Sequence, residues 1–171
     1  MIYDVVNKTL WLVGLVLLQA LLFNKIIVAG VATPLPYIYL LITWNKDGTR
    51  WILLLVGFLI GLIIDSFANL PGINAASCVL LAMLQPVYLN MFIPRELQYE
   101  RSLVPSIATI RWNGFLFFAF LCVLTHHITV VVLEYFSLND LGGMLIRIVG
   151  CSLLTMAFIL VFEMLRMKER N

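Results

Sequence analysis

Asp65 is an acid inside an apolar stretch, which makes it the first candidate for chemistry. It lies about fourteen residues into the run Trp51–Asn69. A carboxylate at such a depth in a membrane costs several kcal/mol unless it is paired or hydrated. It is therefore either a proton or ligand site, or a structural partner of another helix. We favour the structural interpretation, in which Asp65 pairs with a neighbouring helix or caps the next one, because no second acid lies at that depth to form a proton relay.

Arg147, His126 and His127 are the other polar groups expected at a similar depth. Arg147 could form an ion pair with Asp65 or with Glu134, or it could extend to lipid headgroups. We predict the pair with Asp65. Two adjacent histidines point to different faces of a helix and supply too few ligands for a metal site, so we interpret them as packing or interface residues. The sequence has no P-loop, nucleophile elbow or zinc motif. We therefore expect no enzyme activity, no cofactor and no metal.

Small and polar residues recur every fourth position in the run that carries Asp65. Gly57, Gly61, Asp65 and Asn69 share one helical face at this spacing. Small residues allow another helix to approach closely, and the two glycines form a GxxxG match. We interpret this face as a helix-packing or partner-binding seam, and the sequence leaves open whether the contact is within the protein or with another chain.

The composition is typical of an integral membrane protein. Hydrophobic residues make up 63% of the 171 residues and charged ones 12%, with a mean hydropathy of +1.03. Soluble domains are about half apolar and a quarter charged. We therefore predict one all-α transmembrane domain over residues 1–171, a polytopic helix bundle. The net charge of +2 is too small to indicate a nucleic-acid partner.

Apolar runs predict six membrane spans. They are Leu10–Phe23 with a weaker continuation over Ile26–Val31, Thr33–Trp44, Trp51–Asn69, Gly72–Ile93, Trp112–Tyr135 and Leu141–Leu165. The second is short, since Tyr37–Trp44 would rise only ~12 Å as a helix. It must either include Pro34 and Pro36 in its first helical turn or be re-entrant. We also expect a short interfacial helix after Pro94, and Asn139 or Asp140 as the cap of the last span.

The distribution of Lys and Arg predicts the orientation. With six spans and a cytoplasmic amino terminus, all but Lys25 and Arg147 of the eleven cations lie inside, in agreement with the positive-inside rule. The inner cations are Lys8, Lys46, Arg50, Arg95, Arg101, Arg111, Arg166, Lys168 and Arg170. A five-span arrangement, with Lys8 outside and Lys25 inside, gives the same bias, so the crossing of the second segment stays open. Both arrangements place the carboxyl terminus in the cytoplasm.

The run GLIIDSFANLPGINAASCVLLAMLQP, from Gly61 to Pro86, resembles the central segment of the bacterial rod shape-determining protein MreD family. That family has a similar small-residue helix with an acid near its outer end, a polar turn with glycine, and a second helix. The resemblance extends more loosely over the chain, through its length, its short proline-led second span and its basic tail. It implies a six-span protein of the bacterial inner membrane whose fold is similar to the substrate-binding subunit of energy-coupling-factor transporters.

The same resemblance implies a function and partners. A member of the family would be a non-catalytic scaffold of the cell-elongation complex that supports peptidoglycan synthesis and cell shape. It would bind MreC, and it would link directly or indirectly to MreB and to RodA with its transpeptidase partner, within membrane lipid. The fold similarity supplies the alternative, a vitamin-like solute-binding subunit of a membrane transporter. Such a site needs several convergent polar groups, for which Asp65, Asn69, Asn74, His126 and Arg147 are the candidates.

Overall fold

The computed structural model describes residues 14–19, 21–23, 32–46, 48–99, 103–136 and 140–168, and most of these residues are helical. Within them, four helices are long and apolar enough to cross a membrane, namely α3 (Arg50–Ala68), α4 (Ile73–Phe92), α5 (Ile107–Tyr135) and α6 (Leu141–Lys168). Two elements are short, the helix α2 (Ile38–Ile42) and the 3-10 turn η2 (Arg95–Leu97). The all-α class predicted from the sequence is therefore confirmed for the described residues, and the four apolar helices are compatible with the predicted multi-pass membrane protein.

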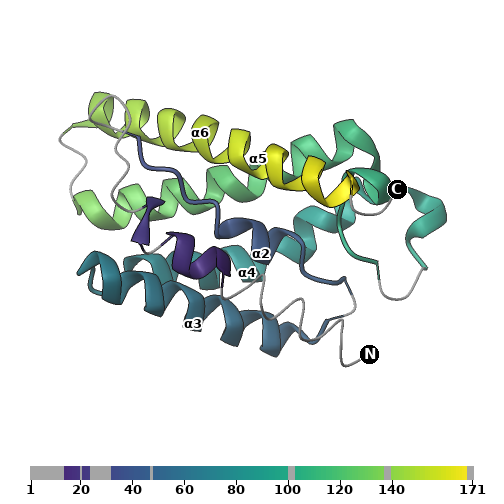
Figure 1. The fold of residues 1–171 in the computed structure, drawn as a ribbon, viewed down its shortest axis with the longest axis horizontal. Helices are drawn as coiled ribbons and strands as arrows, with labels where there is room; N and C mark the ends of the chain where they lie inside the picture. Colours follow the sequence, from purple (N-terminus) through teal and green to yellow (C-terminus); the bar gives the residue numbers. More distant parts are fainter. Residues whose placement is uncertain are drawn as a thin grey trace.

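The four long helices follow one another as antiparallel neighbours, and each packs on the next (Figure 1). One end of the bundle holds the start of α3, the end of α4, the start of α5 and the end of α6. We call it the basic end, because the described cations Lys46, Arg50, Arg95, Arg111, Arg166 and Lys168 lie on the elements that meet there. The opposite end, which we call the Asp65 end, holds the α3–α4 and α5–α6 turns.

Each helix boundary has a local chemical cause. Asn69 ends α3 in the left-handed conformation, with φ 53°, and Gly72 takes φ 83° just before α4. The Ser106 side chain accepts a hydrogen bond from the N–H of Thr109 in a capping box that starts α5. The Asp140 carboxylate accepts from the N–H of Gly143 at 3.0 Å, which confirms Asp140 as a cap of α6.

Residues 32–46, which we call the threaded segment, run between the α3–α4 and α5–α6 pairs (Figure 1). The N–H groups of Thr33 and Leu35 donate to Cys151 and Thr155 of α6, and the Tyr39 hydroxyl donates to Glu163 further along the same helix. The contacts advance together, so the segment runs parallel to α6. From Cys151 to Glu163 α6 rises about 18 Å. Residues 33–39 are far fewer, and they span the same length only because the segment is largely extended before α2 begins.

The predicted spans agree with the structure to different degrees. The third to sixth correspond to α3, α4, the part of α5 from Trp112, and α6. For the first, residues 14–19 and 21 are helical, and residues 10–13, 20 and 24–31 lie outside the described part. In the second, the prolines do not occupy a first helical turn, because Pro34 and Pro36 precede the five-residue helix α2. Where the interfacial helix is expected after Pro94, the described residues 94–99 hold the 3-10 turn η2, and residues 100–102 lie outside the described part.

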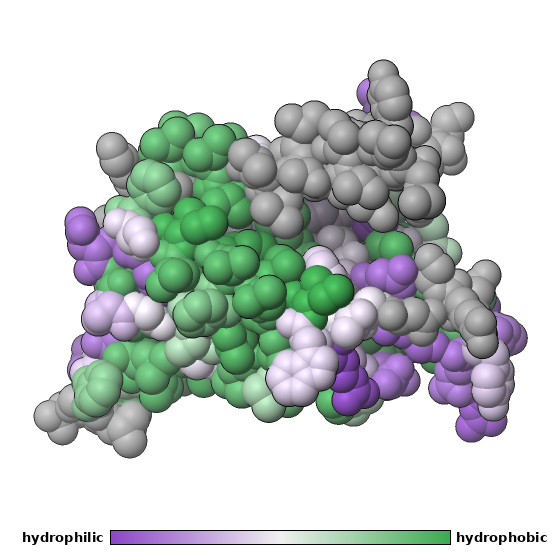
Figure 2. Space-filling view, turned by 90° about the horizontal axis from the view of Figure 1, so that it is seen from below, coloured by the Kyte–Doolittle hydropathy of each residue, from purple (hydrophilic) through white to green (hydrophobic). Residues whose placement is uncertain are grey.

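Large apolar side chains cover the outside of the bundle. Figure 2 shows a broad hydrophobic face with hydrophilic residues gathered toward both ends. On α3 the exposed residues include Ile52, Leu55, Phe58, Leu59, Leu62, Ile63 and Phe67, and on α6 they include Leu145, Ile146, Val149, Leu153 and Val161. An apolar surface of this extent is compatible with a protein embedded in a membrane.

Candidate functional site

The small-residue seam predicted on α3 lies inside the protein and faces α4. Gly57 is buried, and a Cβ atom added there would lie 3.2 Å from the carbonyl oxygen of Cys78. At Gly61 an added Cβ atom would lie 2.6 Å from the backbone nitrogen of Ala75, which is closer than a real contact allows. The GxxxG spacing therefore brings two helix backbones of the same chain together. The question that the sequence left open is answered for both glycines by a contact within the bundle.

Asp65 caps the amino terminus of α4. Its Oδ1 accepts from the backbone N–H of Asn74 at 3.0 Å, and its Oδ2 accepts from that of Ala75 at 2.9 Å. The first N–H groups of a helix have no partner within the helix, and the helix dipole favours a negative charge there. Asp65 is 2% exposed, so these donors stabilise a carboxylate that is almost fully shielded from solvent. The structural interpretation of Asp65 as the cap of the following helix is confirmed.

Asp65 is also the last acceptor in a chain of buried hydrogen bonds. The Asn74 side-chain amide donates to Oδ1 of Asp65 at 2.9 Å, and the Tyr37 hydroxyl donates to Oδ1 of Asn74 at 3.1 Å. The Nε2 atom of His126 lies 2.9 Å from the Tyr37 hydroxyl. Because the single hydroxyl proton is donated to Asn74, His126 must donate through Nε2. The chain therefore joins α3, α4, the threaded segment and α5 in one direction.

His127 faces α6 and supports the threaded segment from the other side. Its Nε2 atom lies 3.0 Å from the Thr155 hydroxyl, which in turn accepts the backbone N–H of Leu35 at 3.0 Å. Both histidines are at most 1% exposed, and their rings meet edge to face at 5.8 Å. The prediction that they point to different faces and act as packing residues agrees with these contacts.

Arg147 does not pair with Asp65, so that prediction was wrong. Its guanidinium lies 2.8 Å from the Glu134 carboxylate, across the turn between α5 and α6, and 5.8 Å from the ring centroid of Tyr135. Asp65 already receives three donors on the other side of the bundle, and Glu134 lies only thirteen residues from Arg147 in the chain. Asn69 also lies apart from the buried chain, because it is the exposed end of α3.

A second buried acid, Glu163 of α6, lies toward the basic end and was missed in the sequence. Its Oε2 accepts from the Tyr39 hydroxyl at 2.6 Å and its Oε1 from the backbone N–H of Ile107 at 3.1 Å, while Arg166 lies 3.5 Å away. Glu163 is fully buried and so links the threaded segment to the start of α5. A single acid in the last turns of an otherwise apolar run, three residues before an arginine, was the available signal.

The buried polar side chains hold the helices and the threaded segment together, and they do not line an open reaction site. The polar groups near Asp65 and Glu163 are hydrogen-bonded to one another and to the threaded segment, and their side chains are almost fully enclosed. In the described part of the chain, no three His, Cys, Asp or Glu side chains come together as ligands for a metal ion. The three cysteines are buried in separate helices and form no disulfide with one another, which agrees with a packing role.

Comparison of the chain with protein-family models, with curated proteins and with solved structures gives no match.

Proposed function

We propose that this protein is a non-catalytic scaffold of MreD type in the bacterial inner membrane, which binds MreC and supports cell-wall elongation. RodA with its transpeptidase partner and the MreB filament are the further components of the assembly. The observation that carries the proposal is how the polar groups of the bundle are used. Asp65, Asn74 and Glu163 form hydrogen bonds to the protein's own backbone and to tyrosines of the threaded segment, so they hold the fold rather than face a substrate.

The outer faces of α3 and α6 offer the surface for a partner's membrane helix. The face of α3 that carries Gly57 and Gly61 is covered by α4, so a partner helix would pack on the exposed apolar side chains described above. Association of helices in lipid depends on shape and close packing, because lipid tails are as apolar as the helices. The glycines act indirectly in this proposal, since they keep α3 and α4 together beneath that surface.

The proposed topology has six spans, with both termini in the cytoplasm and a fold similar to the substrate-binding subunit of energy-coupling-factor transporters. The threaded segment supports it, because it runs parallel to α6 toward the basic end and so counts as a crossing of opposite direction to α3. The cations gathered at the basic end favour a cytoplasmic position for that end, in line with the positive-inside rule.

Affinity purification in mild detergent tests the proposal. The tagged protein is expected to recover MreC, and a photo-crosslinking amino acid at Leu59 of α3 or Leu153 of α6 is expected to capture it from at least one of the two faces. The same amino acid at Leu81, which is buried, serves as the matched control and should capture nothing. A purified protein that binds a vitamin-like solute tightly, and recovers no wall-synthesis component, would favour the transporter alternative and overturn the scaffold.

A further inference from the structure

The helix α5 is broken near its start, at the basic end of the bundle. Ile110 has φ −111° and ψ 15°, and Arg111 has φ 61° and ψ 162°, so neither is helical. A positive φ of this kind favours glycine, and an arginine there is strained. The break turns the chain so that the first turn, which starts at Ile107, leaves the axis of the apolar helix that continues from Trp112.

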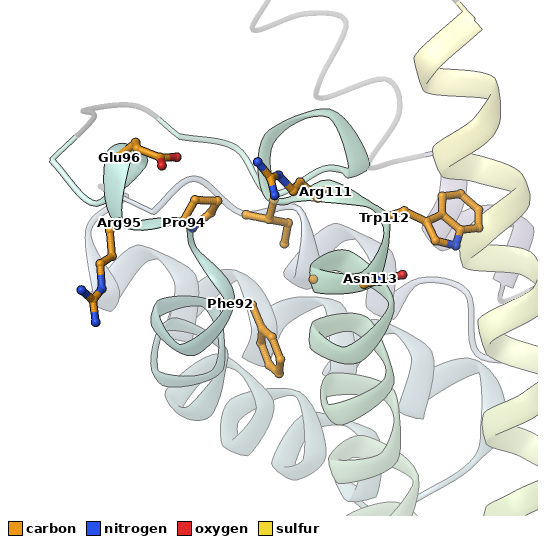
Figure 3. A pocket seen from close by; sticks show the side chains of 9 residues that line it. Phe92, Pro94, Arg95, Glu96, Arg111, Trp112 and Asn113 are labelled. Carbon is orange, nitrogen blue, oxygen red and sulfur yellow. The ribbon is translucent and has the colours of Figure 1, made fainter.

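A pocket of about 650 Å³ opens between this break and the end of α4 (Figure 3). Its lining residues are Phe92, Pro94, Arg95, Glu96, Ile110, Arg111, Trp112, Asn113 and Gly114. Gly114 lies beside the carbonyl oxygen of Phe92, and a Cβ atom added there would make ordinary contact with it at 3.6 Å. A volume of this size lies in the range of small-molecule sites.

Opposite charges face one another across the pocket. In Figure 3 the Arg111 side chain extends from the helix break toward the Glu96 carboxylate on the opposite rim, and the side chain of Arg95 points away from both. Within the part of the chain that the structure describes, Arg111 and Glu96 form neither a hydrogen bond nor an ion pair. A phosphate alone would pair with Arg111 but would be repelled by Glu96. An amine alone would pair with Glu96 but would be repelled by Arg111. A group that carries both charges would satisfy both side chains.

We propose that this pocket binds a phosphoethanolamine group, with its phosphate on Arg111 and its amine on Glu96. Arginine is well suited to phosphate, because its planar donors match two oxygens at once. The positive end of the helix that restarts at Trp112 adds to the attraction for the phosphate.

The position of the pocket indicates a phospholipid headgroup as the source of that group. The apolar helix α4 ends and the apolar part of α5 begins at this level, with Trp112 at the boundary, a position that tryptophans favour at membrane interfaces. Below the pocket the rings of Phe92 and Phe117 stack with centroids 6.4 Å apart, and Phe117 is exposed. An acyl chain could therefore continue from the headgroup along this aromatic surface. The inference is independent of the proposed scaffold function.

Native mass spectrometry of the full-length protein in detergent would test the assignment. The protein is titrated with short-chain phosphatidylethanolamine, phosphatidylglycerol and phosphatidylcholine, and phosphatidylethanolamine is expected to bind most tightly. A second arm adds water-soluble glycerophosphoethanolamine as a competitor. Displacement of the lipid at equal concentration would show that a soluble molecule supplies the group, and failure to displace it would show that the acyl chains contribute, as a lipid requires.

Three substitutions separate the two halves of the site. Arg111→Gly removes the guanidinium and accepts the positive φ without strain, so the fold is expected to remain while phosphatidylethanolamine binding weakens about tenfold to a hundredfold. Arg111→Lys keeps the charge but loses the planar pair of donors, so its affinity should lie between those of the unaltered protein and Arg111→Gly. Glu96→Gln should remove the preference for phosphatidylethanolamine over phosphatidylglycerol. Arg50→Gln is the matched control, because Arg50 is an exposed cation at the same end outside the pocket, and it should change nothing.

Two results would overturn the proposal. The first is equal binding of the three lipids to the unaltered protein. The second is a phosphatidylethanolamine affinity that Arg111→Gly and Glu96→Gln both leave unchanged while each variant still elutes as the unaltered protein does in size-exclusion chromatography.

Discussion

Adding one methyl group at Gly61 is expected to separate α3 from α4, whereas the same change at Gly57 is expected to be tolerated. The Cβ atom of Gly61→Ala would lie 2.6 Å from the nitrogen of Ala75 and closer still to its Cα atom, and ordinary contact begins at 3.4 Å, so α4 must move by more than about 0.8 Å. At Gly57 the nearest atom is 3.2 Å away, and a shift of about 0.2 Å suffices.

The expected free energies follow from these shifts. Overpacking of this size costs about 1–3 kcal/mol, and at Gly61 the displaced atoms belong to the same turn that donates to Asp65, which places the cost near the upper end. Alanine favours a helix over glycine by about 1 kcal/mol. Gly61→Ala should therefore lose about 2 kcal/mol net, while Gly57→Ala should be close to neutral. For a chain of this length, 2 kcal/mol corresponds to a fall of about 4–8 °C in the unfolding midpoint.

The three native cysteines provide the assay. Cys78, Cys122 and Cys151 are buried in α4, α5 and α6, so a thiol-reactive fluorogenic dye reports unfolding when the detergent-purified protein is heated. Gly57→Ala is the matched control for Gly61→Ala. Equal midpoints for the two variants, or a lower midpoint for Gly57→Ala, would refute the close approach of α4 at Gly61.

Three further predictions concern the charged groups and the topology. Asp65→Ala should lower the unfolding midpoint in the same dye assay by an amount equivalent to about 2–3 kcal/mol, because two helix N–H groups lose their acceptor. Asp65→Asn should cost less stability. Equal losses of stability in the two variants would argue against Asp65 as the cap of α4. In double-mutant cycles, the free-energy effects of Arg147→Ala and Asp65→Ala should add, because the two side chains do not touch. The effects of Arg147→Ala and Glu134→Ala should instead couple by up to about 1 kcal/mol. The reverse pattern would favour the pair of Asp65 with Arg147 that the structure contradicts. Cysteines placed at Lys25 and Lys46 should react with an impermeant thiol reagent from opposite sides of the membrane, and labelling from one side would rule out six spans.

The sequence was sufficient for features that depend on length and periodicity. Uninterrupted apolar runs predicted α3, α4 and α6 to within a few residues, since a helix that crosses lipid must be long and apolar. The spacing of Gly57, Gly61 and Asp65 also predicted a shared packing face. It could not say which helix would cover that face, because periodicity gives the angle of a residue about its own helix and nothing about the neighbour.

The error at Arg147 has the same origin. Depth in the membrane can be estimated from sequence, and Asp65 and Arg147 were expected at similar depths, but their angular positions in the bundle were unknown. The nearer partner along the chain, Glu134, is the one that the α5–α6 turn brings into contact. A short connection between two spans was therefore a better guide than equal depth.

The extended course of the threaded segment had a signal that the helical interpretation overlooked. A residue that precedes proline is restricted to extended backbone, and the prolines at 34 and 36 impose this on Thr33 and Leu35 in turn. Proline also has no backbone N–H, so these two positions need no hydrogen-bond partner in a dry interior. The backbone N–H groups of Thr33 and Leu35 remain, and they donate to the side chains of Cys151 and Thr155.

The partners of the threaded segment on α6 have a consequence for biosynthesis. The chain separations between these hydrogen-bonded residues are 118 and 120 positions, so at about 5–20 residues per second α6 follows the segment by roughly 6–24 s. During that interval the N–H groups of Thr33 and Leu35 lack their final acceptors, and in the proposed membrane setting lipid offers no substitute. The segment must therefore wait in a hydrated or chaperoned place, such as the insertion channel, until the last helix arrives. A chain truncated before Cys151 could not complete this step, and we expect membrane quality-control proteases to recognise it.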